Sequence, residues 1–223
     1  MIGQALYTGI SRDSADALLA LVVAEGSAAH LHPKSDVLTQ GAEAARNVAD
    51  IVHLLCLLHG RHPGVVDHAI NRVTNTATRA FLSDAADAFS HERALLTKLV
   101  VAVGPLPSTP GQADTETTVL AQHHAIDMLA QSERTGCALG AALALIADWS
   151  AVRPVLETAA RRLSLDIDKS DLPGATVIAS AIRGADNTAA ADRAMLFGAQ
   201  QIIAQHRGLW DLLEARSVAR SDY

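Results

Sequence analysis

The sequence predicts an all-α protein built as an antiparallel helical bundle, and three observations favour this fold class. Hydrophobic residues make up 49% of the 223 residues but aromatic residues only 3%, and alanine supplies much of the apolar total. Alanine is the best helix former and adds little to the face of a strand. The chain has no sustained apolar–polar alternation and no Asn-Gly or Asp-Gly hairpin turn. Residues that begin and end helices, in contrast, recur along its whole length.

The first half of the chain predicts four helices. Pro63 is suited to the start of a helix, because its fixed φ is helical and its missing N–H needs no partner there. Ser83 and Asp84 supply the cap of the next helix, which reaches Val103. In chain order, we expect helices at residues 13–25, 41–58, 63–82 and 84–103.

The second half begins with a loop, because GPLPSTPGQ contains three prolines and two glycines. The longest periodic stretch follows at residues 113–147, and Asp148 is the expected cap of a further helix that carries Pro154 and ends near Leu163. SLDIDKSDLPG is a second loop. The last two helices are expected at residues 175–184 and 188–216.

No linker is long or polar enough to require two domains, so residues 1–223 are expected to form one domain. Residues 165–223 are the one part that could form a semi-independent helical layer. Short connections favour antiparallel neighbours among the long helices. Within the predicted helix 113–147, small residues stand four apart at Gly136 and Gly140, a spacing that lets another backbone approach closely.

Composition also excludes several partners and compartments. The net charge is −6 and the basic residues are scattered, whereas a nucleic-acid-binding protein carries a basic patch or stripe. The most apolar segment, 137–147, has 11 residues, fewer than the roughly 20 that cross a bilayer. The N-terminus lacks a secretory pattern, and two cysteines within apolar runs fit a reducing compartment. We therefore expect a cytoplasmic protein that binds neither nucleic acid nor membrane.

Residues 53–68 hold four of the ten histidines, which raises the question of a metal site. A helix turns by about 100° per residue, so these histidines point to different sides and favour a solvated corner between two helices. His59, at a helix end, is expected there as one of the solvated side chains. Asp50 and His53 are the exception: they are three residues apart on a polar face and could hold one cation or bond each other.

Polar residues on apolar seams give a stronger signal. Glu92 stands at the centre of a helical stripe formed by Ala85, Phe89, Leu96, Leu99 and Val103. A buried carboxylate must take up a proton, pair with a base such as Arg46 or Arg79, or bind a metal. Glu116 and His123 interrupt a second stripe, and His206 lies between Ile203 and Trp210 on a third.

Carboxylates and histidines on inward seams of several helices are how metal sites in bundle cores are built, and here the sequence resembles the ferritin-like bundles. The resemblance implies a ferritin-like bundle with additional C-terminal helices and a metal centre of iron, manganese or zinc, with Glu92, Glu116, His123 and His206 as candidate ligands. The Glu-x-x-His motif of that family is absent, and only Asp50-x-x-His53 approximates it. A mononuclear site, a bundle that has lost its metal and a plain hydrogen-bond network all remain open.

Two functions follow from this pattern. The first is a helical bundle that binds a transition metal in its core; the metal would be the agent of any catalysis, since no Ser or Cys stands in a nucleophile constellation. The second is a non-catalytic interaction or regulatory protein, such as a homo-oligomer, that docks through a leftover apolar stripe. The residues of that stripe are Leu209, Trp210, Leu212 and Leu213. The sequence does not decide whether the protein is an enzyme.

Overall fold

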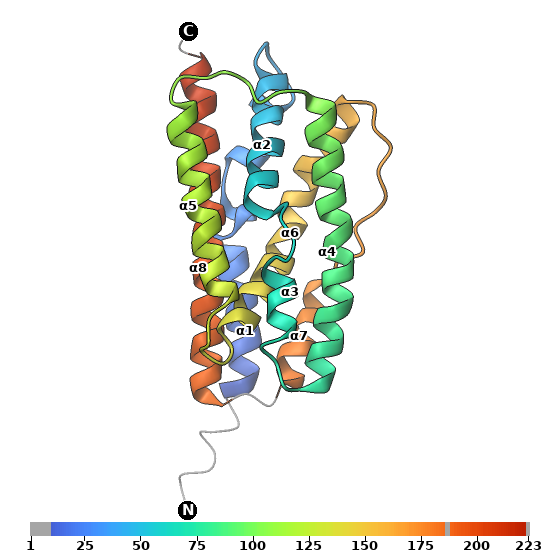
Figure 1. Cartoon of the computed structure of the whole chain (residues 1–223), viewed down its shortest axis with the longest axis vertical. Helices are drawn as coiled ribbons and strands as arrows, with labels where there is room; N and C mark the ends of the chain where they lie inside the picture. The colour runs from blue at the N-terminus through green and yellow to red at the C-terminus, as the bar shows by residue number, and fades with distance from the viewer. Residues whose placement is uncertain (1–9, 186–187, 222–223) are drawn as a thin grey trace, which may run out of the picture.

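The computed structural model describes residues 10–185 and 188–221, and the expected all-α class is confirmed (Figure 1). This part of the chain contains eight α-helices and no strand. Three short 3-10 turns connect the first helix to the second, at Ser27–Ala29, His32–Lys34 and Asp36–Leu38. The helices are α1 (Ile10–Glu25), α2 (Ala44–His59), α3 (Val65–Ile70), α4 (Thr76–Val103), α5 (Gln112–Ala130), α6 (Cys137–Arg162), α7 (Ala175–Gly184) and α8 (Ala189–Ser221).

The helices α2 and α3 follow one another in a single column that lies between α4 and α5 (Figure 1). The long α4 runs against the direction of this column, and the connection from α4 to α5, residues 104–111, crosses over the start of α2. Behind the column lies α6, which packs along α8. The α2–α3 column therefore has its outer side between two long helices and its inner side against the core.

The start of α4 differs from the sequence prediction. The expected cap was Ser83, but the helix begins at Thr76. Asn75 is the cap, because its side-chain oxygen accepts a hydrogen bond from the backbone N–H of Thr78 (3.0 Å). Ser83 and Asp84 lie on the exposed side of α4, where they do not interrupt the helix. The helix expected before this cap is consequently short and becomes α3.

The longest expected helix, 113–147, is divided between α5 and α6. The break lies at Gly136, whose φ of +95° is a left-handed conformation that favours glycine. After this turn α6 continues straight through Asp148, the residue predicted to cap a new helix. Asp148 is buried in the middle of α6 and serves the core instead of a helix end.

Close approach of α6 and α8 depends on glycine, as the spacing of Gly136 and Gly140 predicted. A Cβ atom on Gly140 would collide with the carbonyl oxygen of Met195 in α8. In the opposite direction, a Cβ atom on Gly198 would collide with the carbonyl oxygen of Cys137 in α6. The two backbones therefore touch, which aligns the buried polar groups of α6 with those of α8.

By length and composition, α6 could cross a membrane, since it is longer than the apolar segment recognised in the sequence. However, 78% of its most apolar window is buried inside the bundle. Burial of this kind is typical of the central helix of a helical core.

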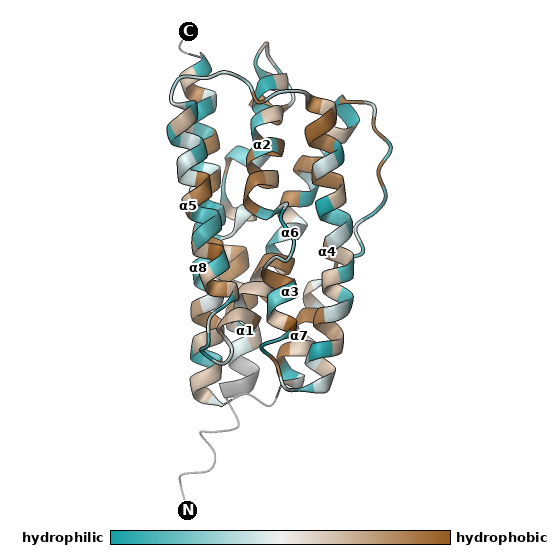
Figure 2. Ribbon diagram, viewed as in Figure 1, coloured by the Kyte–Doolittle hydropathy of each residue, from teal (hydrophilic) through white to brown (hydrophobic). Residues whose placement is uncertain are grey.

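Apolar residues gather on the sides of the helices that face one another (Figure 2). The two largest fully buried side chains are Trp149 of α6 and Trp210 of α8. The prediction of a docking surface on the apolar stripe of α8 is therefore wrong. Leu209, Trp210 and Leu213 are at most 1% exposed and belong to the core.

Candidate functional site

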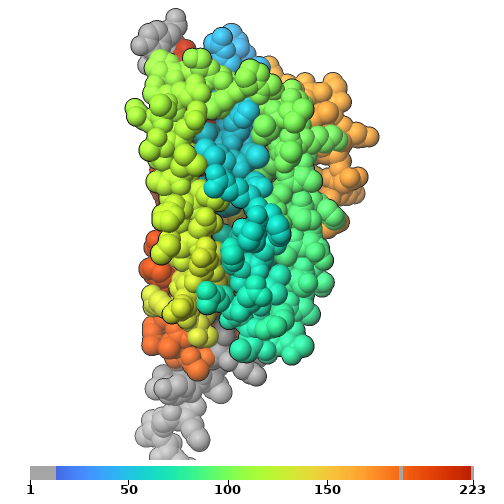
Figure 3. All heavy atoms as spheres, viewed as in Figure 1, coloured from blue at the N-terminus to red at the C-terminus, as the bar shows by residue number. Residues whose placement is uncertain are grey.

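A groove with a volume of about 460 Å³ lies over the outer side of α2; we call it the α2 groove. Its apolar lining consists of Leu54 and Leu57 from α2, Val100 from α4 and Leu106 from the 104–111 connection. In the space-filling view, α2 is visible between α5 and α4 beneath this connection (Figure 3). The groove thus has α2 as its floor, two long helices as walls and the connection as a roof.

Polar side chains complete the lining of the α2 groove. Near the roof, His53 Nε2 donates to the carbonyl oxygen of Gly104 (2.8 Å), and Gln112 donates to Glu116 Oε1 (2.9 Å). Cys56, three residues after His53, also lines the groove, and burial raises the pKa of its thiol, so it stays protonated at neutral pH. Arg61 follows the end of α2 at the opposite end of the groove.

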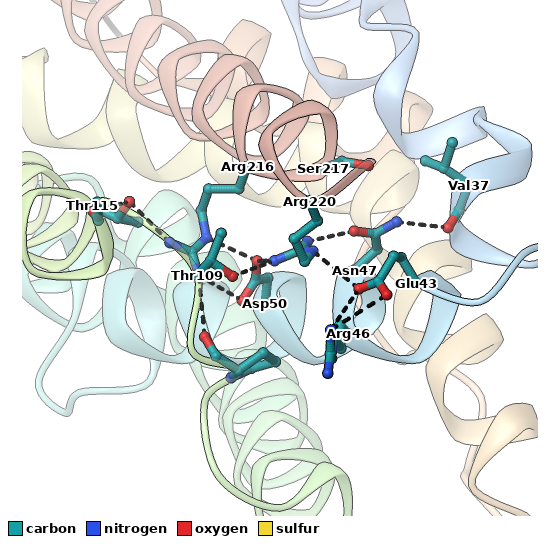
Figure 4. Close-up of polar contacts among 12 residues, drawn as sticks. Val37, Glu43, Arg46, Asn47, Asp50, Thr109, Thr115, Arg216, Ser217 and Arg220 are labelled. Carbon is teal, nitrogen blue, oxygen red and sulfur yellow. Dashed lines mark hydrogen bonds and ion pairs between the residues drawn. The ribbon is translucent and has the colours of Figure 1, made fainter. Parts of the chain in front are cut away.

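The roof of the groove is held by a buried ion cluster (Figure 4). Arg216 of α8 donates from Nε and Nη2 to the two carboxylate oxygens of Asp50 (2.8 and 3.0 Å) and from Nη1 to Thr115 (3.2 Å). Arg220 donates from Nη1 to Asp50 Oδ2 (2.5 Å) and to Thr109 in the roof (2.9 Å). The cluster therefore fastens the 104–111 connection and the start of α5 to α2 through α8.

The position of Asp50 corrects the sequence analysis, which placed it with His53 on a polar face. Asp50 is 0% exposed, and its partners are the guanidinium groups of α8 rather than His53 or a bound cation. Two guanidiniums meet one carboxylate at the centre of the cluster. Glu43 supplies a second negative charge at longer range, 3.9 Å from Arg220 Nε.

A second buried network crosses the core from α2 to α8 through two histidines. The Nε2 atoms of His59 and His206 lie 2.8 Å apart, and His206 Nδ1 lies 2.6 Å from Asp148 Oδ2. Ser27 donates to Asp148 from its backbone N (2.7 Å) and from its hydroxyl (2.5 Å), and Trp210 Nε1 donates to the Ser27 hydroxyl (2.8 Å). These five residues form the histidine–aspartate network.

The protons of this network follow from its acceptors. A carboxylate only accepts, so Nδ1 of His206 carries a proton directed at Asp148. Burial works to raise the pKa of Asp148, but hydrogen bonds from His206 and Ser27 and the charge of His206 outweigh it and hold the pKa below its usual value. Burial, with the charges of His206 and His123, lowers the pKa of His59 well below 6.5, so His59 is neutral at neutral pH.

His59 therefore differs from the solvated corner residue that the sequence predicted. Its ring packs edge-on against Trp149, with ring centroids 5.6 Å apart, and against Phe89 at 6.4 Å. The end of α2 carries His59 into the core rather than into solvent, and its hydrogen-bond partner there is the ring of His206, which in turn is bonded to Asp148.

Glu92 belongs to a third network, and the sequence-based expectation of a buried carboxylate on this seam is met: it is 1% exposed. Its partner is Arg153 (2.6 Å) rather than the suggested Arg46 or Arg79. Ser170 donates to the same carboxylate oxygen (2.6 Å), and Trp149 Nε1 donates to the other (3.0 Å). Of the options for a buried carboxylate, pairing with a base is the one that the structure adopts.

The four predicted metal ligands are divided among these features. Glu92 is occupied by Arg153, and Glu116 lines the α2 groove. His206 bonds His59, while His123 Nδ1 donates to the Leu58 carbonyl (2.9 Å), close enough to His59 to lower its pKa. Across residues 10–185 and 188–221, no group of three or more His, Cys, Asp or Glu side chains could hold a metal ion. Metal binding by these residues stays a prediction from the sequence pattern.

Sequence reasoning missed the residues that organise these networks, Asp148, Arg153 and Arg216. Asp148 and Arg153 stand out as charges that follow the most apolar segment of the chain, which was a usable signal for buried pairs. Arg216 and Arg220 are four residues apart and so share a face of α8, but the helix was expected to end at the first of them.

Comparison with family models finds one match, a family of unknown function (DUF6975), over residues 22–221. The chain belongs to this family. No curated protein and no solved structure matches the chain. The DUF6975 assignment also overturns the ferritin-like resemblance: no ferritin-like family is found, and helices with polar residues on their inner seams are not specific to ferritin-like proteins.

Proposed function

We propose that this DUF6975 protein binds a small amphipathic molecule in the α2 groove, without catalysis. The observation that carries the proposal is the composition of the groove: an apolar centre of Leu54, Leu57, Val100 and Leu106 between polar groups contributed by separate elements. Ligand sites in proteins typically combine a mainly apolar lining with a few placed polar groups, in cavities of about 300–1,000 Å³.

The geometry of the roof supports this proposal. The 104–111 connection contains prolines and is bonded at both ends, through Gly104 to His53 and through Thr109 to Arg220. A roof held in this way keeps the groove open before a ligand arrives, which lowers the ordering cost of binding. The histidine–aspartate network is buried on the other side of α2 and is not part of the groove lining.

Fluorescence titration with anilinonaphthalene sulfonate, an apolar ring system with one negative charge, tests the proposal. We expect saturable binding to the folded protein at one site. Arg61→Ala should weaken it about two- to fivefold, the range for an exposed ion pair. Arg162→Ala, at the exposed end of α6, is the matched control and should leave the affinity unchanged. Equal affinities of the two variants, or no saturable binding, would overturn the proposal.

Cys56 offers an independent measurement, because it is the cysteine in the groove, while Cys137 is 1% exposed in α6. Alkylation of Cys56 with N-ethylmaleimide at mildly alkaline pH should block binding of the probe. At ten times its Kd, the probe should in turn slow alkylation about tenfold. A Cys56→Ala variant should bind the probe before and after the same treatment; loss of binding in that variant would show that the reagent acts elsewhere.

The metal hypothesis has a separate test, although the contacts of Glu92 and His206 support metal binding less well than the groove lining supports ligand binding. Glu92 would have to exchange Arg153 for a metal ion, and His206 would have to release His59 or Asp148. Elemental analysis of protein purified without an affinity tag should show near-stoichiometric iron, manganese or zinc if the hypothesis is right. Loss of that metal in Glu92→Gln would assign it to this residue.

A further inference from the structure

Two side chains of opposite charge line the α2 groove without pairing. Glu116 accepts a hydrogen bond from the neutral Gln112, and Arg61 has no hydrogen bond or ion pair within the described part of the chain. Since an ion pair between them would place nitrogen and oxygen within 4.0 Å, Glu116 and Arg61 stand farther apart than that. One groove therefore presents one unpaired negative and one unpaired positive charge.

The register of α2 and α5 places these two charges at opposite ends of the groove. The helices run in the same direction (Figure 1), and His123 of α5 bonds the carbonyl of Leu58 in α2. Glu116 lies seven residues before His123, whereas Arg61 lies three residues after Leu58. With a rise of 1.5 Å per residue, Glu116 stands about 10 Å along α5 from His123, whereas Arg61 lies beyond the end of α2 on the other side of that contact.

We propose that the α2 groove takes an elongated molecule with an anionic end and a cationic end, of the class of the linear ω-amino carboxylates. Its carboxylate lies at Arg61, its ammonium group at Glu116, and its apolar chain along Leu54, Leu57 and Val100. This inference rests on the proposed function of the groove and adds the chemical class of the ligand.

Charge complementarity carries the choice of this class. A guanidinium binds a carboxylate with two parallel hydrogen bonds, which orients the ligand at Arg61. Glu116 then repels any ligand whose far end is also negative and attracts one whose far end is positive. The apolar centre excludes a ligand that is charged along its whole length, because its charges would lose water there without partners.

Displacement of anilinonaphthalene sulfonate tests the inference with three linear twelve-carbon ligands: ω-aminododecanoate, laurate and dodecanedioate. The first and last share a carboxylate at one end and carry an ammonium group or a second carboxylate at the other, so the charge at that end is reversed. We expect ω-aminododecanoate to bind about tenfold more tightly than dodecanedioate, the combined effect of an attraction and a repulsion at a partly exposed site.

Glu116→Gln should remove this preference by strengthening dodecanedioate and weakening ω-aminododecanoate, while laurate changes little. Glu133→Gln, an exposed carboxylate after α5, is the matched control and should keep the preference. Equal affinities of the two doubly charged ligands, or a preference that survives Glu116→Gln, would overturn the inference. If the probe binds at Arg61 but no linear ligand displaces it, the inference fails and the proposed function stands; if the probe does not bind, both fail.

Discussion

Replacing Asp50 with asparagine should destabilise the protein more than any exposed charge substitution. Asp50 accepts three charge-assisted hydrogen bonds from Arg216 and Arg220 at 2.5 to 3.0 Å and is 0% exposed. The variant leaves two buried guanidiniums without their shared carboxylate, and breaking a buried pair in this way costs about 3–5 kcal/mol. For a chain of this size, that loss corresponds to a Tm lower by about 6–20 °C.

Urea unfolding followed by circular dichroism measures the loss as a lower midpoint with an unchanged slope. The control is Asp16→Asn, which breaks an exposed pair with Arg183 (2.7 Å) and should cost less than about 1 kcal/mol. Adding Arg220→Gln to Asp50→Asn should recover part of the loss, because one unpaired guanidinium is removed. An Asp50→Asn variant as stable as Asp16→Asn would refute the reasoning.

Three further predictions concern the core. Burial lowers the pKa of His59 below 6.5, so the unfolded chain binds a proton that the folded chain excludes. The free energy of unfolding should therefore fall as pH drops below 6.5, by up to about 1.4 kcal/mol per pH unit. His59→Gln should reduce this dependence of stability on pH, as measured by urea unfolding. An equal pH dependence in both proteins would exclude His59 as its source. Gly140→Ala should cost about 1–3 kcal/mol in the same assay, because its Cβ meets the Met195 carbonyl. Gly174→Ala, which faces open space, should stay within about 0.5 kcal/mol. Glu92→Gln should lower stability by about 3 kcal/mol yet leave probe binding in the α2 groove unchanged; lost binding in a folded variant would show that the groove and this network are coupled.

The helical class could be read from the sequence, and so could one close contact and one buried charge. Alanine-rich periodic segments, the Gly136 to Gly140 spacing and Glu92 on an apolar stripe are local patterns, and each reflects a local cause. The helix boundaries were harder to predict from the sequence. Asp148 has the chemistry of a cap, but in α6 its carboxylate is bonded by Ser27 and His206, so tertiary bonds replace the local one.

The site could not be predicted because its bonds join residues far apart in the chain. Asp50 and Arg216 are separated by 166 positions, and nothing in either neighbourhood indicates the other. The sequence pattern therefore assigned Asp50 to a polar face, because Asp50 shares one side of the helix with Arg46 and His53. Glu116 was found as a candidate on a stripe, but the structure places it on the wall of a groove, since that stripe is only partly covered by α2 and α8.

The chain has two tryptophans, and each indole N–H is bonded within a different polar network. Trp149 donates to Glu92 and touches the ring of His59, whereas Trp210 donates to Ser27 beside Asp148. Intrinsic tryptophan fluorescence is consequently a label-free reporter of both networks. A variant that keeps only Trp149 reports on the surroundings of Glu92 in α4, and a variant that keeps only Trp210 reports on the surroundings of Asp148 beside α8. Local loosening near α4 can therefore be distinguished from loosening near α8 before the whole molecule unfolds.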